Sequence, residues 1–313
     1  MDDLEDRLLT RNGLATRRLA AMLLDQAEDA RLPRLKDYAE QMGVGNGTAQ
    51  AALQTLEDTG AIETVARGHL GTFLVRADRA RLWRLAGLGT VLAAMPLPYS
   101  RRYEGLASGL RAAYEAAGLP FAVTFMRGAT ARVAALLEGK ADVVVASRLA
   151  ADRLVESHPV ELVADLGAET YVGSHGLLLR DGVTVDAPGL RVAVDSASED
   201  QRVLAERAFT GRGEDVVWVE ASYMQLRSLF ERGEVDATVW NLDEVQDRLG
   251  PGVRALPLDD RITRELAQRN SSAAFLTRAG EAGRFTVLRE TVDMSLITEV
   301  QRQVVRGDRL PTY

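Results

Sequence analysis

The sequence predicts an α/β protein in two parts: a small helical unit with a two-stranded hairpin, followed by a larger region of two similar lobes. Two observations carry this expectation. Three amphipathic helix patterns crowd into the first 60 residues. From about residue 87 onward, strand-like and helix-like segments alternate, which is typical of layered α/β folds. A length of 313 residues suits about two domains of ordinary size.

The composition excludes several kinds of site. The chain has no cysteine, and its three histidines, His69, His158 and His175, are far apart, so disulfides, thiolate chemistry and a multi-histidine metal site are disfavoured. The N-terminus is acidic, and the longest uncharged apolar stretch, residues 85–98, is too short to cross a bilayer. We therefore expect a soluble cytoplasmic protein with no cofactor and no membrane contact. A net charge of −7 still permits a local DNA-binding module.

Three stripes of apolar residues at helical spacing predict three short amphipathic helices near the N-terminus. The stripes are Ala20, Leu23, Leu24 and Ala27; Leu35, Tyr38, Ala39 and Met42; and Ala49, Ala52, Leu53 and Leu56. Residues 43–45 separate the second stripe from the third by a glycine-bearing turn, as in a helix-turn-helix. Strand-like runs at 62–65 and 72–75 flank a loop with two glycines, which predicts a two-stranded wing.

Residues 14–76 resemble the GntR-type winged helix. The resemblance rests on the Leu-Pro opening at 32–33, the helix pair, Gly60-Ala61-Ile62 and Gly71-Thr72-Phe73. It implies contacts with an operator in double-stranded DNA from Lys36, Asn46, Thr48, Gln50, Gln54, Arg67 and His69. Asn46 and Gln50 stand where that family has arginines, and amides favour adenine whereas arginine favours guanine, so we expect a shifted sequence preference. A unit that serves dimerisation or protein binding instead is the alternative.

The arginine-rich residues 77–86 are expected to be a linker between a DNA-binding domain, 1–76, and a ligand-sensing domain, 87–313. In the second domain we expect one lobe from 87–172 plus 262–313 and another from 185–261. The expected strands are 90–95, 121–125, 141–146, 190–194, 216–219 and 235–240, and the expected helices are 101–118, 131–138, 198–209 and 224–232.

An approximate internal repeat supports the two lobes. The Gly-x-x-Asp run at residues 139–142 recurs at 233–236, each time between a helix and a β-rich segment. Two similar lobes imply a cleft, because ligands of open α/β sheets bind beyond the carboxyl ends of the strands. This region resembles a type 2 periplasmic-binding-protein fold, as used by solute-binding proteins and by the sensor domains of LysR-type regulators.

The full combination of domains resembles the YhfZ family of regulators over nearly the whole chain. The wing at residues 67–73 and the Gly-Ser-His-Gly segment at 173–176 suggest it most. The resemblance implies a DNA-binding transcriptional regulator and names no effector. We expect it to bind DNA as a homodimer.

The loops at strand ends and helix starts predict a site for a small, anionic metabolite, because helix N-termini offer free backbone N–H groups. The candidate residues are Tyr99, Ser100, Arg101, Arg127, Thr130, Ser147, Arg148, Ser174, His175, Asp195, Ser196, Ser198, Trp240 and Asn241. Ser100, Thr130 and Ser198 equally suit ordinary N-caps. Asp195, Glu199 and Asp200 suit an amine, so a ligand with both a carboxylate and an amine is compatible.

An enzyme is the alternative function, because the two-lobed fold also occurs in biosynthetic enzymes and a winged-helix module can be appended to one. No Ser-His-Asp spacing, dinucleotide fingerprint or phosphate loop is recognisable in the sequence. The winged helix favours a regulator that senses a small-molecule effector.

Overall fold

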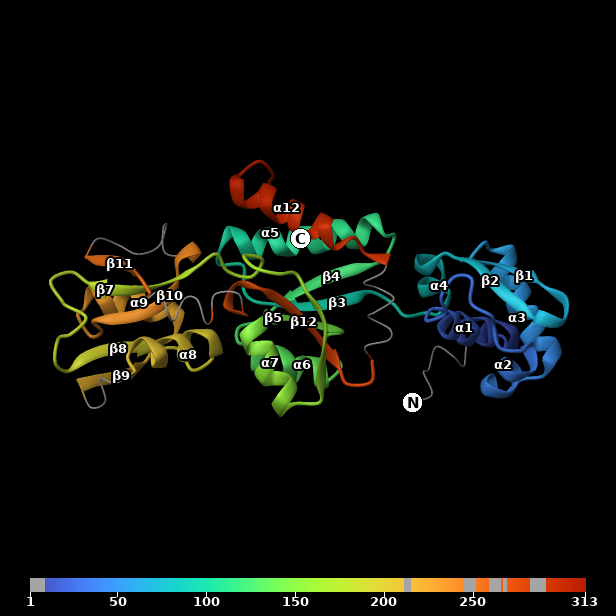
Figure 1. Cartoon of the computed structure of the whole chain (residues 1–313), viewed down its shortest axis with the longest axis horizontal. Coiled ribbons are helices and arrows are strands. Elements are labelled where there is room, and N and C mark those ends of the chain that lie inside the picture. Colours follow the sequence, from blue (N-terminus) through green and yellow to red (C-terminus); the bar gives the residue numbers. More distant parts are fainter. Residues whose placement is uncertain (1–8, 211–214, 245–251, 259–265, 267–268, 282–290) are drawn as a thin grey trace. The chain divides into compact units, whose positions relative to one another are not determined.

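A computed structural model describes residues 9–210, 215–244, 252–258, 266, 269–281 and 291–313. The chain divides into two compact units. The first comprises residues 1–90 with the segments 114–120 and 283–292, and the second comprises the remainder. The expected fold class is confirmed, because a helix-turn-helix unit precedes an α/β part with two separate mixed sheets (Figure 1).

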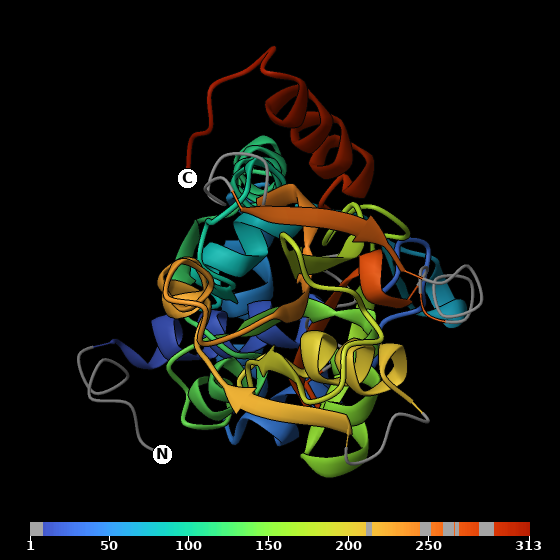
Figure 2. The same cartoon turned by 90° about the vertical axis from the view of Figure 1, so that its left-hand side faces the viewer.

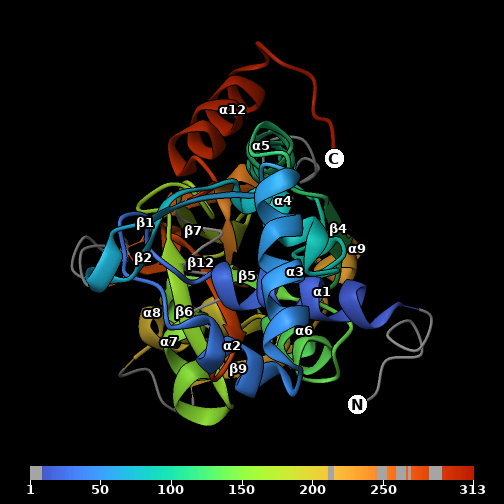
Figure 3. The same ribbon diagram turned by 90° about the vertical axis from the view of Figure 1, so that its right-hand side faces the viewer.

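Three helices form the core of the first unit: α1 (Arg11–Leu23), α2 (Leu35–Met42) and α3 (Asn46–Asp58) (Figure 3). The second and third stripes lie within α2 and α3, which bury three of the four residues of each stripe and leave Leu35 and Leu53 half-buried. The prediction that one helix contains the whole first stripe is wrong, because α1 ends at Leu23 and Ala27 lies beyond it.

A left-handed glycine makes the turn between α2 and α3. Gly43 caps α2 with a φ of 67°, a backbone conformation that favours glycine because it has no Cβ. The expected wing is also present as an antiparallel hairpin of β1 (Ile62–Ala66) and β2 (Thr72–Ala77), joined through the short helix η2 (Gly68–Leu70).

The expected linker at 77–86 is instead largely helical. Helix α4 (Arg79–Leu85) packs against α1 and buries Leu82 and Trp83, the latter 1% exposed. The Trp83 indole N–H donates to the Gly89 carbonyl at 2.8 Å. The first unit therefore extends beyond the wing.

The first lobe of the second unit has a five-stranded sheet in the order β4-β3-β5-β12-β6. Strands β3, β4 and β5 are parallel, and β12 is antiparallel to both of its neighbours. The strands are β3 (Val91–Met95), β4 (Phe121–Phe125), β5 (Val143–Ser147), β6 (Val160–Asp165) and β12 (Ala273–Arg278), and the helices are α5 (Arg101–Ala116), α6 (Ala129–Leu137), α7 (Arg148–Ser157) and α12 (Met294–Arg306).

The second lobe has a sheet in the order β11-β7-β10-β8-β9, with α8 (Glu199–Ala208) and α9 (Tyr223–Glu231) on opposite faces (Figure 2). Because side chains alternate along a strand, Leu177 and Leu179 join the core under α8, whereas Leu178 joins the core under α9. The strands are β7 (His175–Arg180), β8 (Leu190–Val194), β9 (Val216–Glu220), β10 (Ala237–Asn241) and β11 (Val253–Pro257), and the short helix η4 (Leu242–Glu244) follows β10.

The internal repeat is confirmed by the topology. In each lobe three parallel strands occupy equivalent places, and a fourth strand, β12 or β7, joins them antiparallel. Asp142 accepts the backbone N–H of Leu92 at 2.9 Å, and Asp236 accepts that of Arg191 at 3.2 Å, so both repeated aspartates tie the central strand to its neighbour. Strand β7 lies outside the expected second lobe, 185–261, which therefore begins earlier.

Asp236 also has a role that Asp142 lacks, because it receives two guanidinium groups. The Arg191 Nε donates at 2.8 Å and the Arg180 Nη2 at 2.6 Å. The hydrogen bonds from Arg191 and then from Arg180 lower the pKa of Asp236 to about 2. A carboxyl group whose pKa is lower in the folded than in the unfolded chain stabilises the fold above its unfolded pKa, about 4.

We expect Asp236→Asn to lower the free energy of unfolding by about 2 kcal/mol at pH 7, because two guanidinium groups lose their charged acceptor. The difference from the wild type should persist down to about pH 4 and shrink as the pH falls toward 2. Urea unfolding between pH 7 and pH 3 measures it. Asp142→Asn is the matched control, with a smaller expected loss at pH 7. Equal losses from both variants would contradict a special role for the arginines.

Candidate functional sites

Helix α3 presents a row of amides to solvent. Asn46, Gln50 and Gln54 are exposed and four residues apart, so they share one helix face opposite the buried core stripe. Thr48 is half-buried beside them. The Gln54 amide donates to Asp58 at 2.8 Å, which engages part of its hydrogen-bonding capacity within the helix. An exposed polar face of this kind suits the edges of bases in a major groove.

The remaining candidate DNA contacts are also accessible. Lys36 is exposed in the first turn of α2, and His69 is exposed at the tip of the wing. The Arg67 guanidinium lies over the Phe73 ring, 4.5 Å from its centroid, so a cation–π contact holds this arginine against the wing.

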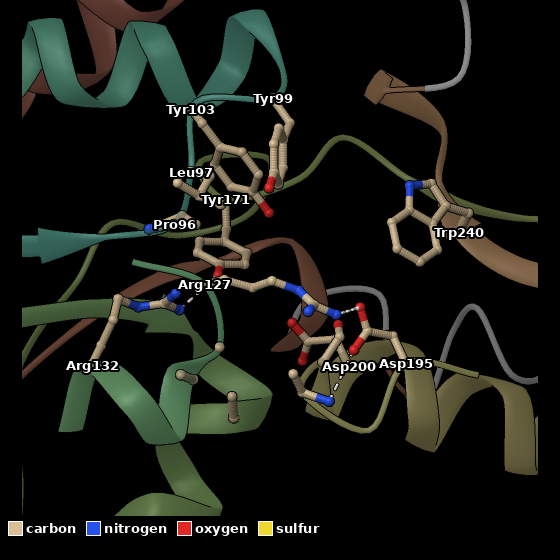
Figure 4. Close-up of a pocket in the computed structure, with 15 residues that line it drawn as sticks. Pro96, Leu97, Tyr99, Tyr103, Arg127, Arg132, Tyr171, Asp195, Asp200 and Trp240 are labelled. Carbon is tan, nitrogen blue, oxygen red and sulfur yellow. Dashed lines mark hydrogen bonds and ion pairs between the residues drawn. The ribbon is translucent and has the colours of Figure 1, made fainter. Parts of the chain in front are cut away.

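A cavity of about 110 Å³ lies between the two lobes of the second unit (Figure 4), with room for several water molecules or one small metabolite. Its wall comes from the loops after β3, β4 and β8, from the starts of helices α5 to α8, and from β10. The lining residues are Pro96, Leu97, Tyr99, Tyr103, Arg127, Gly128, Ala129, Arg132, Ala150, Tyr171, Asp195, Ala197, Ser198, Asp200 and Trp240. The cavity therefore lies at the carboxyl ends of parallel strands from both lobes.

Five of the residues expected from the sequence line this cavity: Tyr99, Arg127, Asp195, Ser198 and Trp240. Two of the expected hydroxyls support helix starts instead. The Tyr103 N–H donates to Ser100 at 3.3 Å, and the Ala150 N–H donates to Ser147 at 3.0 Å. Arg101 and Thr130 are exposed at the starts of α5 and α6 and do not line the cavity.

The other expected residues also lie outside the cavity wall. Arg148 donates to Asp152 at 2.7 Å and to Asp165 at 2.8 Å. The Ser196 hydroxyl donates to Glu220 at 2.7 Å, and Ser174 is exposed in the chain crossover. His175 and Asn241 are paired across β7 and β10. Burial lowers the pKa of His175 to about 4, so its ring is neutral near pH 7. The Glu199 side chain lies outside the described residues.

The sequence did not predict Tyr103, Arg132 or Tyr171 as cavity residues. It indicated Asp200 only as a possible acceptor for an amine. All four line the cavity. Arg132 left a signal, because it stands one helical turn before Leu136 on the apolar, buried face of α6. A charged residue within such a stripe is unusual and points to a partner or a ligand.

Arg132 is buried, with 2% of its surface exposed. Its Nη1 donates to the Met126 carbonyl at 2.8 Å, and its Nη2 lies 3.4 Å from the Tyr171 hydroxyl, a long contact. Its Nε has no hydrogen-bond partner among the described residues. Burial raises the pKa of Tyr171, whereas the positive charge of Arg132 opposes that rise and the negative charge of Asp200 adds to it. Tyr171 therefore lies within the fields of both groups.

Charged and polar contacts join the two lobes around the cavity. Arg127 forms an ion pair with Asp195, and the Ser147 hydroxyl donates to Asp200 at 2.6 Å. Each of these contacts links a residue of the first lobe to one of the second. At the crossover, the Arg102 Nε donates to Asp243 at 3.0 Å. Of the residues in these contacts, Arg127, Asp195 and Asp200 also line the cavity.

None of the helices in the described part of the chain has the length and apolar character needed to cross a membrane. Among the same residues, no cluster of three or more histidine, aspartate or glutamate side chains is arranged to hold a metal ion.

Comparisons with known proteins assign both parts of the chain. The profile of the YhfZ C-terminal domain matches residues 78–313, and that of a helix-turn-helix domain matches residues 28–74. The protein YhfZ of Escherichia coli (strain K12) is 37% identical over 305 residues, which cover 97% of this chain and 98% of the relative.

Solved structures agree with these assignments. The crystal structure of YhfZ from Shigella flexneri is 37% identical and superimposes with a TM-score of 0.63 over 75% of this chain and 98% of its own. The periplasmic aliphatic sulphonate binding protein SsuA of Escherichia coli, at 15% identity, has a TM-score of 0.53 over 70% of this chain and 75% of its own. The likeness to SsuA shows a shared two-lobed fold of the periplasmic-binding-protein type.

Proposed function

Because the chain belongs to the YhfZ family, with a helix-turn-helix domain ahead of the YhfZ C-terminal domain, we propose that it is a transcriptional regulator controlled by a small molecule. The observation that carries the proposal is the combination of an exposed amide row on α3 with an inter-lobe cavity in the other unit. Such a protein works on DNA in the cytoplasm and carries out no catalysis.

In this proposal α3 enters the major groove with Asn46, Thr48, Gln50 and Gln54, while Lys36 and the wing residues Arg67 and His69 contact phosphate or the minor groove. Two chains bind as a homodimer and read half-sites about one helical turn apart. The effector acts by binding one arrangement of the lobes better than another. A preference of about 1.4 kcal/mol already gives tenfold coupling to DNA affinity.

Selection from random-sequence duplex DNA tests the proposal, and we expect a palindromic site to be enriched. Replacing Gln50 with alanine should weaken binding to that site about 5- to 150-fold, since an amide–base pair contributes about 1–3 kcal/mol. Lys36→Ala should weaken binding to all sequences and reduce the slope of log K against log salt concentration by about 0.9. Binding isotherms at several salt concentrations measure both effects.

Gln303→Ala, which removes an amide from helix α12 of the other unit, is the matched control and should bind as the wild type does. Unchanged affinity in the Gln50→Ala and Lys36→Ala variants would show that α3 does not contact DNA as proposed. Recovery of no DNA at all, with and without small molecules, would overturn the regulator itself. Sedimentation of the complex reports whether two chains bind one site.

A further inference from the structure

We infer that the inter-lobe cavity binds a compact monocarboxylate, whose carboxylate group contacts the guanidinium of Arg132 and the N-terminus of helix α6. This inference rests on the proposed function, because it names the chemical class of the effector. It places the anion at Arg132 rather than at Arg127 or Arg148, the arginines that the sequence indicated.

Arg132 is a buried cation in the cavity wall. It is 2% exposed, and Figure 4 shows its side chain reaching from α6 toward Tyr171. Within the described part of the chain its guanidinium contacts the Met126 carbonyl and the Tyr171 hydroxyl, and its Nε has no acceptor. Neither contact supplies a negative charge. Because a buried arginine is rare without a counter-ion, a guanidinium in this position indicates that an anion binds beside it.

The start of helix α6 adds further donors to the same part of the wall. Gly128 precedes the helix and has no side chain to cap it, and both Gly128 and Ala129 line the cavity. The N–H groups of a first helical turn have no acceptor within the helix, and together with the helix dipole they attract anions. Arg132 ends that turn, since its own N–H donates to the Gly128 carbonyl at 3.2 Å. One short stretch, residues 128–132, therefore supplies both kinds of donor.

The two arginines that the sequence indicated are already paired with carboxylates. Arg127 forms an ion pair with Asp195, and its side chain is 41% exposed. Arg148 pairs with two aspartates of its own lobe and lies outside the cavity wall. A ligand would have to displace a carboxylate from either of them, whereas at Arg132 it displaces none. Arg132 is therefore the favoured contact for an anion.

The charges of the wall favour a ligand with a single negative charge. Asp195 and Asp200 also line the cavity, so a second negative charge on the ligand would be repelled, which disfavours phosphate and dicarboxylates. A carboxylate suits Arg132 in shape as well, because the planar guanidinium offers parallel N–H groups to its two oxygens.

The rest of the wall and the size of the cavity favour a compact apolar body. The apolar and aromatic residues of the wall include Pro96, Leu97, Ala150, Tyr99, Tyr103, Tyr171 and Trp240. The rings of Tyr103 and Tyr171 meet edge-on at 5.2 Å. The volume of about 110 Å³ is smaller than the roughly 150 Å³ of a protein cavity that admits benzene, so we expect a body of up to about five carbon atoms.

Calorimetric titration of the full-length protein tests this class directly. The probes are straight and branched monocarboxylates of about three to six carbon atoms, their 2-oxo and 2-hydroxy derivatives, and the primary amide of each, which keeps the shape and loses the charge. We expect at least one acid to bind, and its amide to bind about 10- to 150-fold more weakly, because hydrogen bonds to charged groups are the stronger ones.

Several results of the same titrations would overturn the inference. One is binding of the amide that equals or exceeds that of its acid. Another is tighter binding of the matching sulphonate, the matching dicarboxylate or inorganic phosphate. A third is binding of no monocarboxylate at about 10 mM, a concentration that reveals even very weak affinity.

Arg132→Met tests the contact itself. We expect this variant to bind the acid no more tightly than the amide, while its affinity for the amide stays near that of the wild type. A purely structural arginine would instead lower both affinities together, and that result, like an unchanged preference for the acid, would overturn the inference. Arg148→Met, at an arginine paired outside the cavity, is the matched control and should keep the preference of the wild type.

Arg132→Lys decides the matter if circular dichroism shows that Arg132→Met does not fold. A lysine keeps the buried charge and loses the fork of donors, so this variant should bind the acid about tenfold more weakly and still prefer it to the amide. Affinity equal to that of the wild type would overturn the contact with the guanidinium.

The two proposals fail in different ways. If a palindromic DNA site is bound but no monocarboxylate is, the ligand class is wrong and the regulator stands. If a monocarboxylate binds and depends on Arg132 but no DNA is recovered, the cavity assignment stands and the regulator is wrong.

Discussion

Trp83→Ala is expected to lower the free energy of unfolding of the first unit by about 3–5 kcal/mol, the usual cost of truncating a fully buried tryptophan. Trp83 is 1% exposed within α4, which packs on α1. The substitution also removes the 2.8 Å hydrogen bond to the Gly89 carbonyl. Hydrogen exchange measured by mass spectrometry over peptides from α1 and α3 reports this stability separately from that of the second unit.

The matched control is Trp218→Ala, because Trp218 is 45% exposed and its ring meets Phe209 edge-on at 6.2 Å. We expect that variant to cost about 1 kcal/mol. If Trp83→Ala cost no more than Trp218→Ala, residues 77–86 would behave as the linker that the sequence predicts, and α4 would not belong to the core of the first unit.

Gly109→Ala should destabilise the second unit by about 3 kcal/mol or more, because helices α5 and α12 approach too closely for a side chain there. A Cβ atom at Gly109 would overlap the Ile297 carbonyl oxygen, and one at Gly105, a turn earlier, would lie 2.9 Å from the Gln301 carbonyl oxygen. Both obstacles are backbone atoms, so only a shift of a whole helix relieves the overlap. Thermal unfolding followed by circular dichroism measures the loss.

Gly47→Ala is the matched control for this prediction, because it makes the same change in a helix where nothing lies within 4 Å of the new atom. There alanine should stabilise the protein by up to about 1 kcal/mol, through its better helix propensity. The two substitutions should therefore change stability in opposite directions. A stabilising Gly109→Ala would mean that α5 and α12 are not in the contact described.

The elements that the sequence predicts well are those whose signals are local. Strands 121–125 and 190–194 match β4 and β8 because each is a short apolar run bounded by glycine or proline. The sequence did not predict helix α4, because Arg79, Arg81 and Arg84 dominate its composition and only two apolar residues mark the face that it buries. The sequence also did not predict strand β12. Both of its partners, β5 and β6, are far away in the chain, and no local pattern indicates that pairing.

The cavity residues, too, were predictable only where a local signal marks them. Loops after strands contributed Tyr99, Arg127 and Asp195, as the rule for open α/β sheets predicts. Hydroxyls at helix starts could not be assigned from sequence, because the same residue caps a helix or meets a ligand, and Ser147 does the first while contacting Asp200 across the lobes. Tyr171 lies in the crossover between the lobes, where periodicity carries no information.

The order of strands in the first lobe has a consequence for biosynthesis. Among the described strands, β6 pairs with β12 alone, and the strands and helices described for the second lobe lie between these two in the sequence. At about 5–20 residues per second, the ribosome needs roughly 5–20 s to deliver β12 after β6 has emerged. During that interval β6 lacks its strand partner β12, whereas the second lobe can already complete its own sheet. The later-encoded lobe is therefore expected to mature first, and nascent chains stalled before residue 273 should expose β6 to chaperones.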